Sequence, residues 1–103
     1  MALASFEKQP YESWVVAANF EDDLETGETI TLETSAITAV DRAGTDATAG
    51  ILDQAYKAVN DALLQIRVKD GTAALSMYKI TFKAITNLSN KFELDINMKV
   101  KEH

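Results

Sequence analysis

Alternating apolar and polar residues mark the last quarter of the chain as β structure. In residues 92–100 every second position is apolar and the positions between are charged or amide side chains, and residues 78–84 repeat the pattern. A period of two places all apolar side chains of a strand on one face. Turn-forming residues occupy positions 87–90 between the two runs. The pattern therefore predicts an antiparallel hairpin with a loop of about four residues, and we expect its core residues to be Ile80, Phe82, Leu94 and Ile96.

Earlier segments carry the same alternation. It is visible in residues 14–20 and again in residues 64–68, where the turn-forming pair Asp70-Gly71 follows. Another apolar run begins at Ile30 and Leu32 and continues through residues 36–40, between a turn at 26–28 and a polar loop at 41–46. We expect each of these segments to form a strand.

Residues 51–59 fit two alternatives. Their apolar members have helical spacing, and no proline interrupts a helix over residues 49–62. The same residues also fit two short strands around Asp53-Gln54. We favour strands, because the neighbouring runs have period two and an isolated helix would need its own packing surface. About seven short strands with frequent turns predict an all-β, immunoglobulin-like antiparallel β-sandwich, with residues 1–103 as one domain.

Composition limits the classes of function. The chain has 103 residues, 47% of them hydrophobic and 25% charged, as expected for one globular domain. Its net charge is -6 and its basic residues are scattered, so we expect no nucleic-acid partner. Residues 1–8 lack a basic start followed by an apolar stretch, so we expect neither a signal peptide nor a membrane anchor. Without cysteine, no disulfide or thiolate metal site can form.

Candidate chemistry is sparse. The sole histidine is His103, the last residue, so a serine-histidine catalytic pair is not expected and the chain is predicted not to be an enzyme. His103 is either native or the remnant of a purification tag. A carboxylate pair of the glycosidase type is the remaining catalytic alternative. We therefore assign no catalytic, cofactor-binding or metal-binding residue.

An acidic cluster in residues 21–28 is a candidate calcium site, because carboxylates in a loop bind calcium. Its spacing does not match a calcium-binding loop, in which oxygen ligands alternate before a final glutamate. We favour a solvated acidic loop. The cluster consists of Glu21, Asp22, Asp23, Glu25 and Glu28.

Aromatic and basic residues offer further binding alternatives. Trp14 could stack on a sugar, but it shares the face of Val16 and Phe20, so we favour core packing. Tyr11 and Tyr56 are candidates for a contact surface. The lysines of the last two strands are expected to be exposed and to discourage pairing between sheet edges. They are Lys79, Lys83, Lys91, Lys99 and Lys101.

The order of several segments resembles a family of small structural proteins of tailed bacteriophages and prophages, of the fiber-tail adaptor or neck-region type with immunoglobulin-like folds. The segments are residues 1–10, which include SFEKQP at 5–10, and residues 20–24 (FEDDL), 28–30 (ETI), 41–48 (DRAGTDAT), 64–71 (LQIRVKDG), 78–84 (YKITFKA) and 90–95 (NKFELD). They are strand and turn patterns that span most of the chain, and no catalytic residues accompany them.

The resemblance implies a non-enzymatic virion protein that is assembled in the bacterial cytoplasm and acts through protein–protein contacts. Its expected partners are other phage structural proteins and copies of itself, with no nucleic-acid or membrane partner. The alternatives are a carbohydrate- or surface-binding β-sandwich module and, less favoured, a small enzyme.

Overall fold

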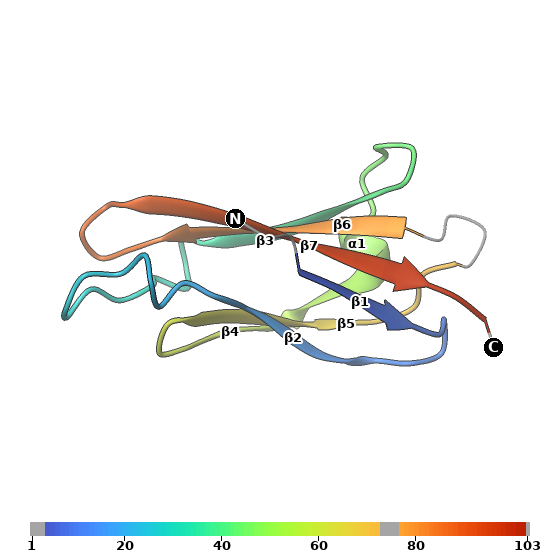
Figure 1. The fold of residues 1–103 in the computed structure, drawn as a ribbon, viewed down its shortest axis with the longest axis horizontal. Helices are drawn as coiled ribbons and strands as arrows, with labels where there is room; N and C mark the ends of the chain where they lie inside the picture. Colours follow the sequence, from blue (N-terminus) through green and yellow to red (C-terminus); the bar gives the residue numbers. More distant parts are fainter. Residues whose placement is uncertain (1–3, 73–76, 103) are drawn as a thin grey trace.

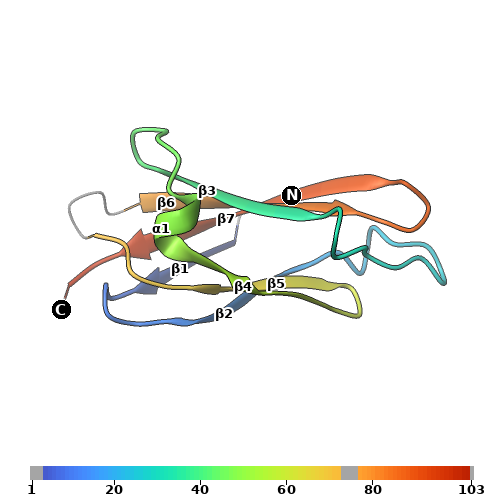
Figure 2. The same cartoon turned by 180° about the vertical axis from the view of Figure 1, so that it is seen from behind.

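The computed structural model describes residues 4–72 and 77–102 and shows a sandwich of two β-sheets (Figures 1 and 2). The four-stranded sheet has the order β1-β7-β6-β3, and the three-stranded sheet has the order β2-β5-β4. A single helical turn, α1, connects β3 to β4. The elements are β1 (Ala4–Lys8), β2 (Trp14–Asn19), β3 (Ala36–Asp41), α1 (Thr48–Ile51), β4 (Leu52–Asn60), β5 (Leu63–Val68), β6 (Met77–Ile85) and β7 (Lys91–Val100).

The strand order is that of an immunoglobulin-like sandwich. In constant-type immunoglobulin domains the sheets have the orders ABED and CFG. Here β2, β5 and β4 take the places of B, E and D, and β3, β6 and β7 those of C, F and G. The first strand differs, since β1 pairs in parallel with β7 and leaves the place beside β2. The predicted all-β sandwich is confirmed.

A buried tyrosine fixes the corner between β5 and β6. The hydroxyl of Tyr78, near the start of β6, accepts a hydrogen bond of 3.1 Å from the backbone N–H of Thr72. Immunoglobulin-like sandwiches use a tyrosine at this corner in the same way. Asp70 and Gly71 turn the chain with φ of 48° and 90°, which confirms the predicted turn. A Cβ atom on Gly71 would lie 2.9 Å from Cγ2 of Val100, so this position requires glycine.

The core lies between the two sheets and draws on both. Leu64 and Ile66 of the three-stranded sheet and Ile80 and Phe82 of the four-stranded sheet are fully buried. Of the four predicted hairpin core residues, Ile80, Phe82 and Ile96 are buried and Leu94 is half-buried against the same cluster. The hairpin is confirmed, with β6 antiparallel to β7.

The strand predicted to begin at Ile30 starts later. Ile30 forms only an isolated bridge to Thr86, and β3 begins at Ala36. Between them the chain turns, because the backbone N–H and the hydroxyl of Ser35 both donate to the carbonyl oxygen of Thr31, at 3.1 and 2.7 Å. Serine and threonine side chains compete in this way with a strand's backbone hydrogen bonds. The expected strand at Ile30 and Leu32 is therefore wrong.

Residues 48–60 combine parts of both alternatives. The chain makes one helical turn, α1, and then one strand, β4, so the favoured strand interpretation is right for residues 52–60 and the long helix is wrong. The predicted pair of short strands is replaced by one strand whose register with β5 shifts between Asp53 and Ala58. Of the helices in residues 4–72 and 77–102, none is long and apolar enough to cross a membrane.

The parallel strand β1 was not expected. Only Phe6 and Lys8 of residues 5–8 turn toward the interior, so the alternation is too short to be recognised. The pairing places Phe6 opposite Met98 and Lys8 opposite Val100, more than ninety residues later in the chain. His103 lies outside the described residues.

Candidate functional site

The outer face of the four-stranded sheet is charged. Residues that alternate with the buried side chains of β6 and β7 point to solvent, and most of them are charged. The predicted exposure of the lysines is confirmed, including Lys101 just beyond β7. We call this surface the charged face. Its exposed charged residues are Glu7, Lys79, Lys83, Lys91, Glu93 and Lys99.

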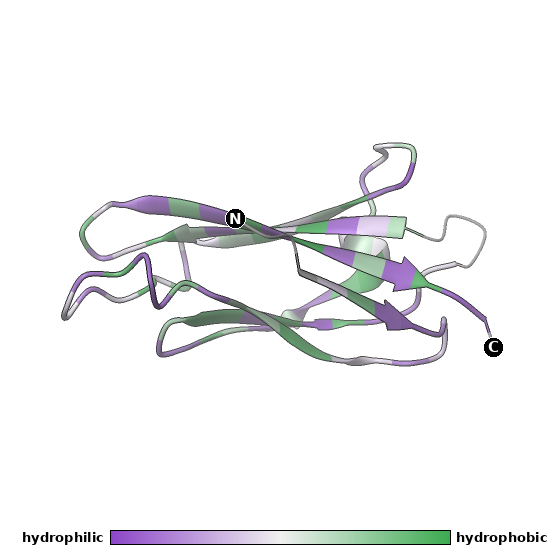
Figure 3. Cartoon of the chain, in the orientation of Figure 1, coloured by the Kyte–Doolittle hydropathy of each residue, from purple (hydrophilic) through white to green (hydrophobic). Residues whose placement is uncertain are grey.

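The outer face of the three-stranded sheet differs in composition. Among the described residues of β2, β4 and β5, the charged side chains on this outer face are Asp53 and Arg67, which lie opposite each other in the β4–β5 pairing. Lys57 of β4 turns away to the edge of β3, where it binds the carbonyl oxygen of Ser35. We call this surface the low-charge face. It comprises Val15, Ala17 and Asn19 of β2, Leu63, Gln65 and Arg67 of β5, and Asp53, Tyr56, Ala58 and Asn60 of β4. In Figure 3, β2 is green along much of its length, whereas β7 alternates between green and purple.

A row of three side chains crosses the low-charge face. Arg67 lies with its guanidinium carbon 4.7 Å from the centroid of the Tyr56 ring, a cation–π contact. On its other side Arg67 is paired with Val15 of β2. Val15 is 43% exposed and Tyr56 is 51% exposed. Aromatic residues and arginine are the side chains most enriched at the centres of protein interfaces, so this row is the most interface-like part of the face.

The other two aromatic candidates differ from Tyr56. Trp14 faces inward and packs against the core, with its ring centroid 5.9 Å from that of Phe6. This confirms the interpretation of Trp14 as a packing residue. Tyr11 lies in the turn between β1 and β2 and is 98% exposed. It is separate from the row formed by Val15, Arg67 and Tyr56.

Side chains and a turn cap the free edge of β3. The backbone groups of Ala39 point away from β6, because its N–H donates to the Thr48 hydroxyl and its carbonyl oxygen accepts from the Ala47 N–H, both at 2.9 Å. Further along the same edge, the carbonyl oxygen of Ile37 accepts from the Gln54 amide at 3.0 Å. Together with Lys57, these groups occupy the positions that an added strand would need.

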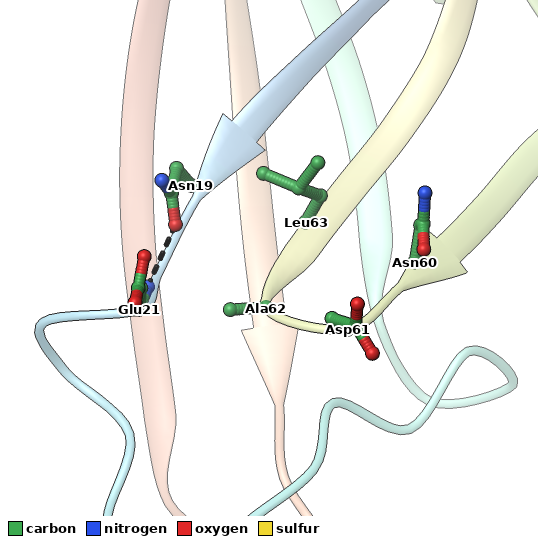
Figure 4. A pocket seen from close by; sticks show the side chains of 6 residues that line it. All are labelled: Asn19, Glu21, Asn60, Asp61, Ala62 and Leu63. Carbon is green, nitrogen blue, oxygen red and sulfur yellow. Dashed lines mark hydrogen bonds between the residues drawn. The ribbon is translucent and has the colours of Figure 1, made fainter.

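Acidic residues gather at one end of the sandwich. Four exposed acidic residues lie in residues 21–25, directly after β2, and Asp61 lies in the β4–β5 turn at the same end. At this end an open hollow of about 420 Å³ lies between the end of β2 and the β4–β5 turn (Figure 4). The Asn19 side chain accepts a hydrogen bond of 2.9 Å from the Glu21 N–H at its rim. The hollow is lined by Asn19, Glu21, Asn60, Asp61, Ala62 and Leu63.

Glu28, one member of the predicted acidic cluster, is turned inward and acts as a structural tie. Its carboxylate accepts hydrogen bonds from the Thr86 hydroxyl, from the Glu25 N–H at 2.9 Å and from the Asn90 amide at 2.9 Å. These donors, the Thr86 hydroxyl first, hold the pKa of Glu28 below its ordinary value. The carboxylate thereby fastens the segment after β2 to the β6–β7 loop.

The rest of the acidic cluster is exposed. Glu21, Asp22, Asp23 and Glu25 all face solvent, as expected for a solvated loop. Across residues 4–72 and 77–102, no three acidic or histidine side chains are grouped in a way that could hold a metal ion. The structure therefore separates Glu28 from the residues with which the sequence groups it.

Lys8 is a second structural tie, at the opposite end of the sandwich. Its side chain is buried, and its ammonium group donates to the carbonyl oxygens of Gln9 at 2.8 Å, Pro10 at 3.3 Å and Asp70. Burial lowers the pKa of Lys8, and the carboxylates of Asp70 and Glu12 oppose this shift. Three carbonyl acceptors match the three N–H donors of an ammonium group. Lys8 therefore joins the β1–β2 turn to the β5–β6 corner.

Sequence reasoning did not find the row of Val15, Arg67 and Tyr56. Its signal is weak, because Arg67 and Tyr56 are eleven positions apart and meet only through the β4–β5 pairing. Comparison with known proteins finds no family model that matches the chain and no curated protein with significant sequence similarity. The surfaces of the molecule and the resemblance of its segments are therefore the basis for a proposed function.

Proposed function

We propose that this chain is a non-enzymatic structural protein of a tailed-phage or prophage particle, in the neck or tail region, and that it binds neighbouring particle proteins through the low-charge face. The observation that carries the proposal is the difference between the two outer faces. One holds exposed lysines and glutamates along β1, β6 and β7, and the described strands of the other carry one aspartate, on β4, and one arginine, on β5.

The composition of the low-charge face suits a protein interface. The buried centre of an interface is depleted in charged side chains, because each buried charge loses its hydration. Ala17, Gln65 and Ala58 lie in register across β2, β5 and β4, so the centre of this face consists of small or neutral side chains. The Tyr56–Arg67 pair beside them supplies an aromatic ring and a guanidinium group, which are common anchors of binding energy.

The charged face suits exposure to solvent. Its lysines and glutamates favour solubility and oppose pairing between copies of the sheet. A subunit with one face of each kind can bind a partner on one side while the other side stays hydrated. The particle context rests on the resemblance of the segments at residues 5–10, 41–48 and 64–71 to small phage structural proteins.

A matched pair of variants tests the proposal in particles. Gln65→Lys places a charge at the centre of the low-charge face, and Thr81→Lys places one at the corresponding point of the charged face, on β6. Both residues are half-buried, polar and on an inner strand of their sheet. We expect Gln65→Lys to reduce the amount of the chain in purified particles by about tenfold, a cost of about 1.4 kcal/mol, and Thr81→Lys to leave it unchanged.

Two outcomes would reject the proposal. Mass spectrometry could show that the wild-type chain is absent from particles produced by a strain that expresses it. Alternatively, Gln65→Lys and Thr81→Lys could both enter particles at the wild-type level while folding normally. Genes for portal, capsid or tail proteins beside the gene for this chain would support the assignment independently.

A further inference from the structure

The outer edge of β2 is open. The Phe20 N–H donates to the Ala62 carbonyl oxygen at 2.9 Å, on the side of β5. Backbone groups alternate in direction along a strand, so the N–H and C=O groups of Val15, Ala17 and Asn19 point away from β5. Within residues 4–72 and 77–102, β2 is the last strand of its sheet and no hydrogen bond reaches this edge from another element.

β2 also lacks the features that protect the other sheet edges. It is six residues long, without charge or proline, and its register with β5 is continuous. By contrast, Lys57 and Gln54 cap the edge of β3, and a register shift interrupts β4. The strand β1 has five residues, two of them charged, and Pro10 follows it. Charge, proline, bulges and capping are the usual means of preventing strand addition.

The place beside β2 is one that immunoglobulin-like sandwiches fill. In the constant-type order, strand A pairs with strand B. In this chain β1 pairs with β7 instead, so the equivalent place beside β2 is left unfilled by the described residues. The geometry of the sandwich therefore accommodates one more strand there.

Charge identifies the kind of segment that fits. Glu12 precedes β2, where its carboxylate also lies near the buried Lys8 ammonium, and Glu21, Asp22 and Asp23 follow β2. Antiparallel pairing of two copies through β2 would bring Glu12 of one copy toward Glu21 of the other, and like charges in that position repel. A segment with basic residues at both ends would instead be attracted to both ends of β2.

We propose that the free edge of β2 binds an extended segment of a partner protein as an added strand, and that this segment has a neutral, β-forming centre with lysine or arginine on each side. Backbone hydrogen bonds to Val15, Ala17 and Asn19 supply the pairing, and the acidic residues at the ends of β2 select the flanks. The partner's origin in the particle rests on the proposed function, but the binding itself does not.

A synthetic peptide tests the site on the isolated chain. The probe is an alternating threonine-valine segment with two lysines at each end, and its control carries glutamates in place of the lysines. Trp14, the sole tryptophan, lies at the start of β2 and reports binding by its fluorescence. We expect saturable binding, slowed amide exchange at Val15, Ala17 and Asn19, and an affinity about tenfold lower for the glutamate peptide or in high salt.

Two alanine positions provide a matched pair of variants. Ala17 and Ala36 are both exposed and both on edge strands, of opposite sheets. Ala17→Lys should lower the affinity for the lysine peptide by about tenfold, because edge lysines block strand addition. Ala36→Lys makes the same change in net charge and should leave the affinity unchanged. Ala17→Pro should abolish binding while keeping the β2–β5 pairing, because it removes only an outward N–H.

The experiments distinguish a failure of the strand-addition site from a failure of the proposed function. Unchanged exchange at Val15 and Ala17 in saturating peptide, or equal affinity for the two peptides, would overturn the strand-addition site. Protection of these amides that grows with protein concentration in the absence of peptide would identify a second copy as the occupant and would also overturn it. Peptide binding by a chain that is absent from particles would reject the proposed function alone.

Discussion

The two outer faces of the sandwich contrast in charge, whereas the two inner faces are alike. The charged face has four lysines on β6 and β7, and the low-charge face has one aspartate and one arginine on β4 and β5. Both sheets contribute fully buried side chains to one core, including Leu64 and Ile66 from one sheet and Ile80 and Phe82 from the other. Folding therefore requires the inner faces to match, but it leaves the outer faces free to differ. The difference between the outer faces is where a functional requirement can be recognised.

The largest expected loss of stability is at the inner faces, where the two sheets form the core. Phe82→Ala removes a fully buried ring and should lower the free energy of unfolding by about 3–5 kcal/mol. Leu63→Ala, on the low-charge face, removes a half-buried side chain and should cost about 1 kcal/mol. Urea denaturation of both variants checks the difference. Equal losses would show that the low-charge face is part of a core and not a free surface.

The second-largest loss of stability is expected at the β5–β6 corner, which joins the two sheets. Gly71→Ala forces a Cβ atom against Val100 at a positive φ, and we expect a loss of about 2–3 kcal/mol. The matched control is Gly44→Ala, where φ is 86° but no atom lies within 4 Å of the added carbon, so only backbone strain of about 1 kcal/mol remains. Thermal unfolding that gives the same loss for both would contradict the close contact with Val100.

A smaller effect depends on pH and concerns the acidic end. The pKa of Glu28 is lowered in the folded chain, so its carboxylate stabilises the fold above its ordinary pKa of 4.5, and this stabilisation is lost as the pH falls through the lower folded value. Glu28→Gln should therefore be less stable than wild type at pH 7. The difference should shrink at pH 3, in chemical denaturation at the two pH values.

Glu25→Gln is the control for that measurement, because the Glu25 side chain is exposed and Glu25 binds Glu28 through its backbone N–H and carbonyl groups. It should have little effect at either pH. If the wild type is more stable than Glu28→Gln by the same amount at pH 3 as at pH 7, the stabilisation comes from hydrogen-bond geometry and not from the charge of the carboxylate.

The smallest expected effects are those on the outer faces themselves. Lys83→Gln on the charged face and Val15→Thr on the low-charge face each change an exposed side chain, and each should alter the free energy of unfolding by less than about 0.5 kcal/mol. A larger loss for Val15→Thr in urea denaturation would indicate that the low-charge face serves stability and would weaken its assignment to binding.

The sequence predicted those parts of the fold that depend on local alternation. The strands at residues 14–20, 64–68, 78–84 and 92–100 were found because each buries every second side chain. The turn at Thr31, the shift in β4 and the parallel pairing of β1 were missed. They depend on the Ser35 hydroxyl, on Gln54 and Lys57 reaching β3, and on a partner strand more than ninety residues away.

The sequence predicted only part of the candidate site. Tyr56 was identified as a contact candidate, but its contact with Arg67 and its place on a face of low charge require the pairing of β4 with β5. The exposure of Lys79, Lys83 and Lys99 followed from alternation, since each stands between two buried residues of the same strand. The edge of β2 is open because β1 pairs with β7, and no local sequence pattern predicts that pairing.

Chemical footprinting of assembled particles tests the central claim most directly, because it reports on both outer faces at once. Lysine acetylation and tyrosine iodination are compared between the isolated chain and the chain in purified particles. We predict that Tyr56 becomes protected in particles while Lys79, Lys83 and Lys99 keep their reactivity. Protected lysines together with a reactive Tyr56 would contradict it and would place the binding surface on the charged face.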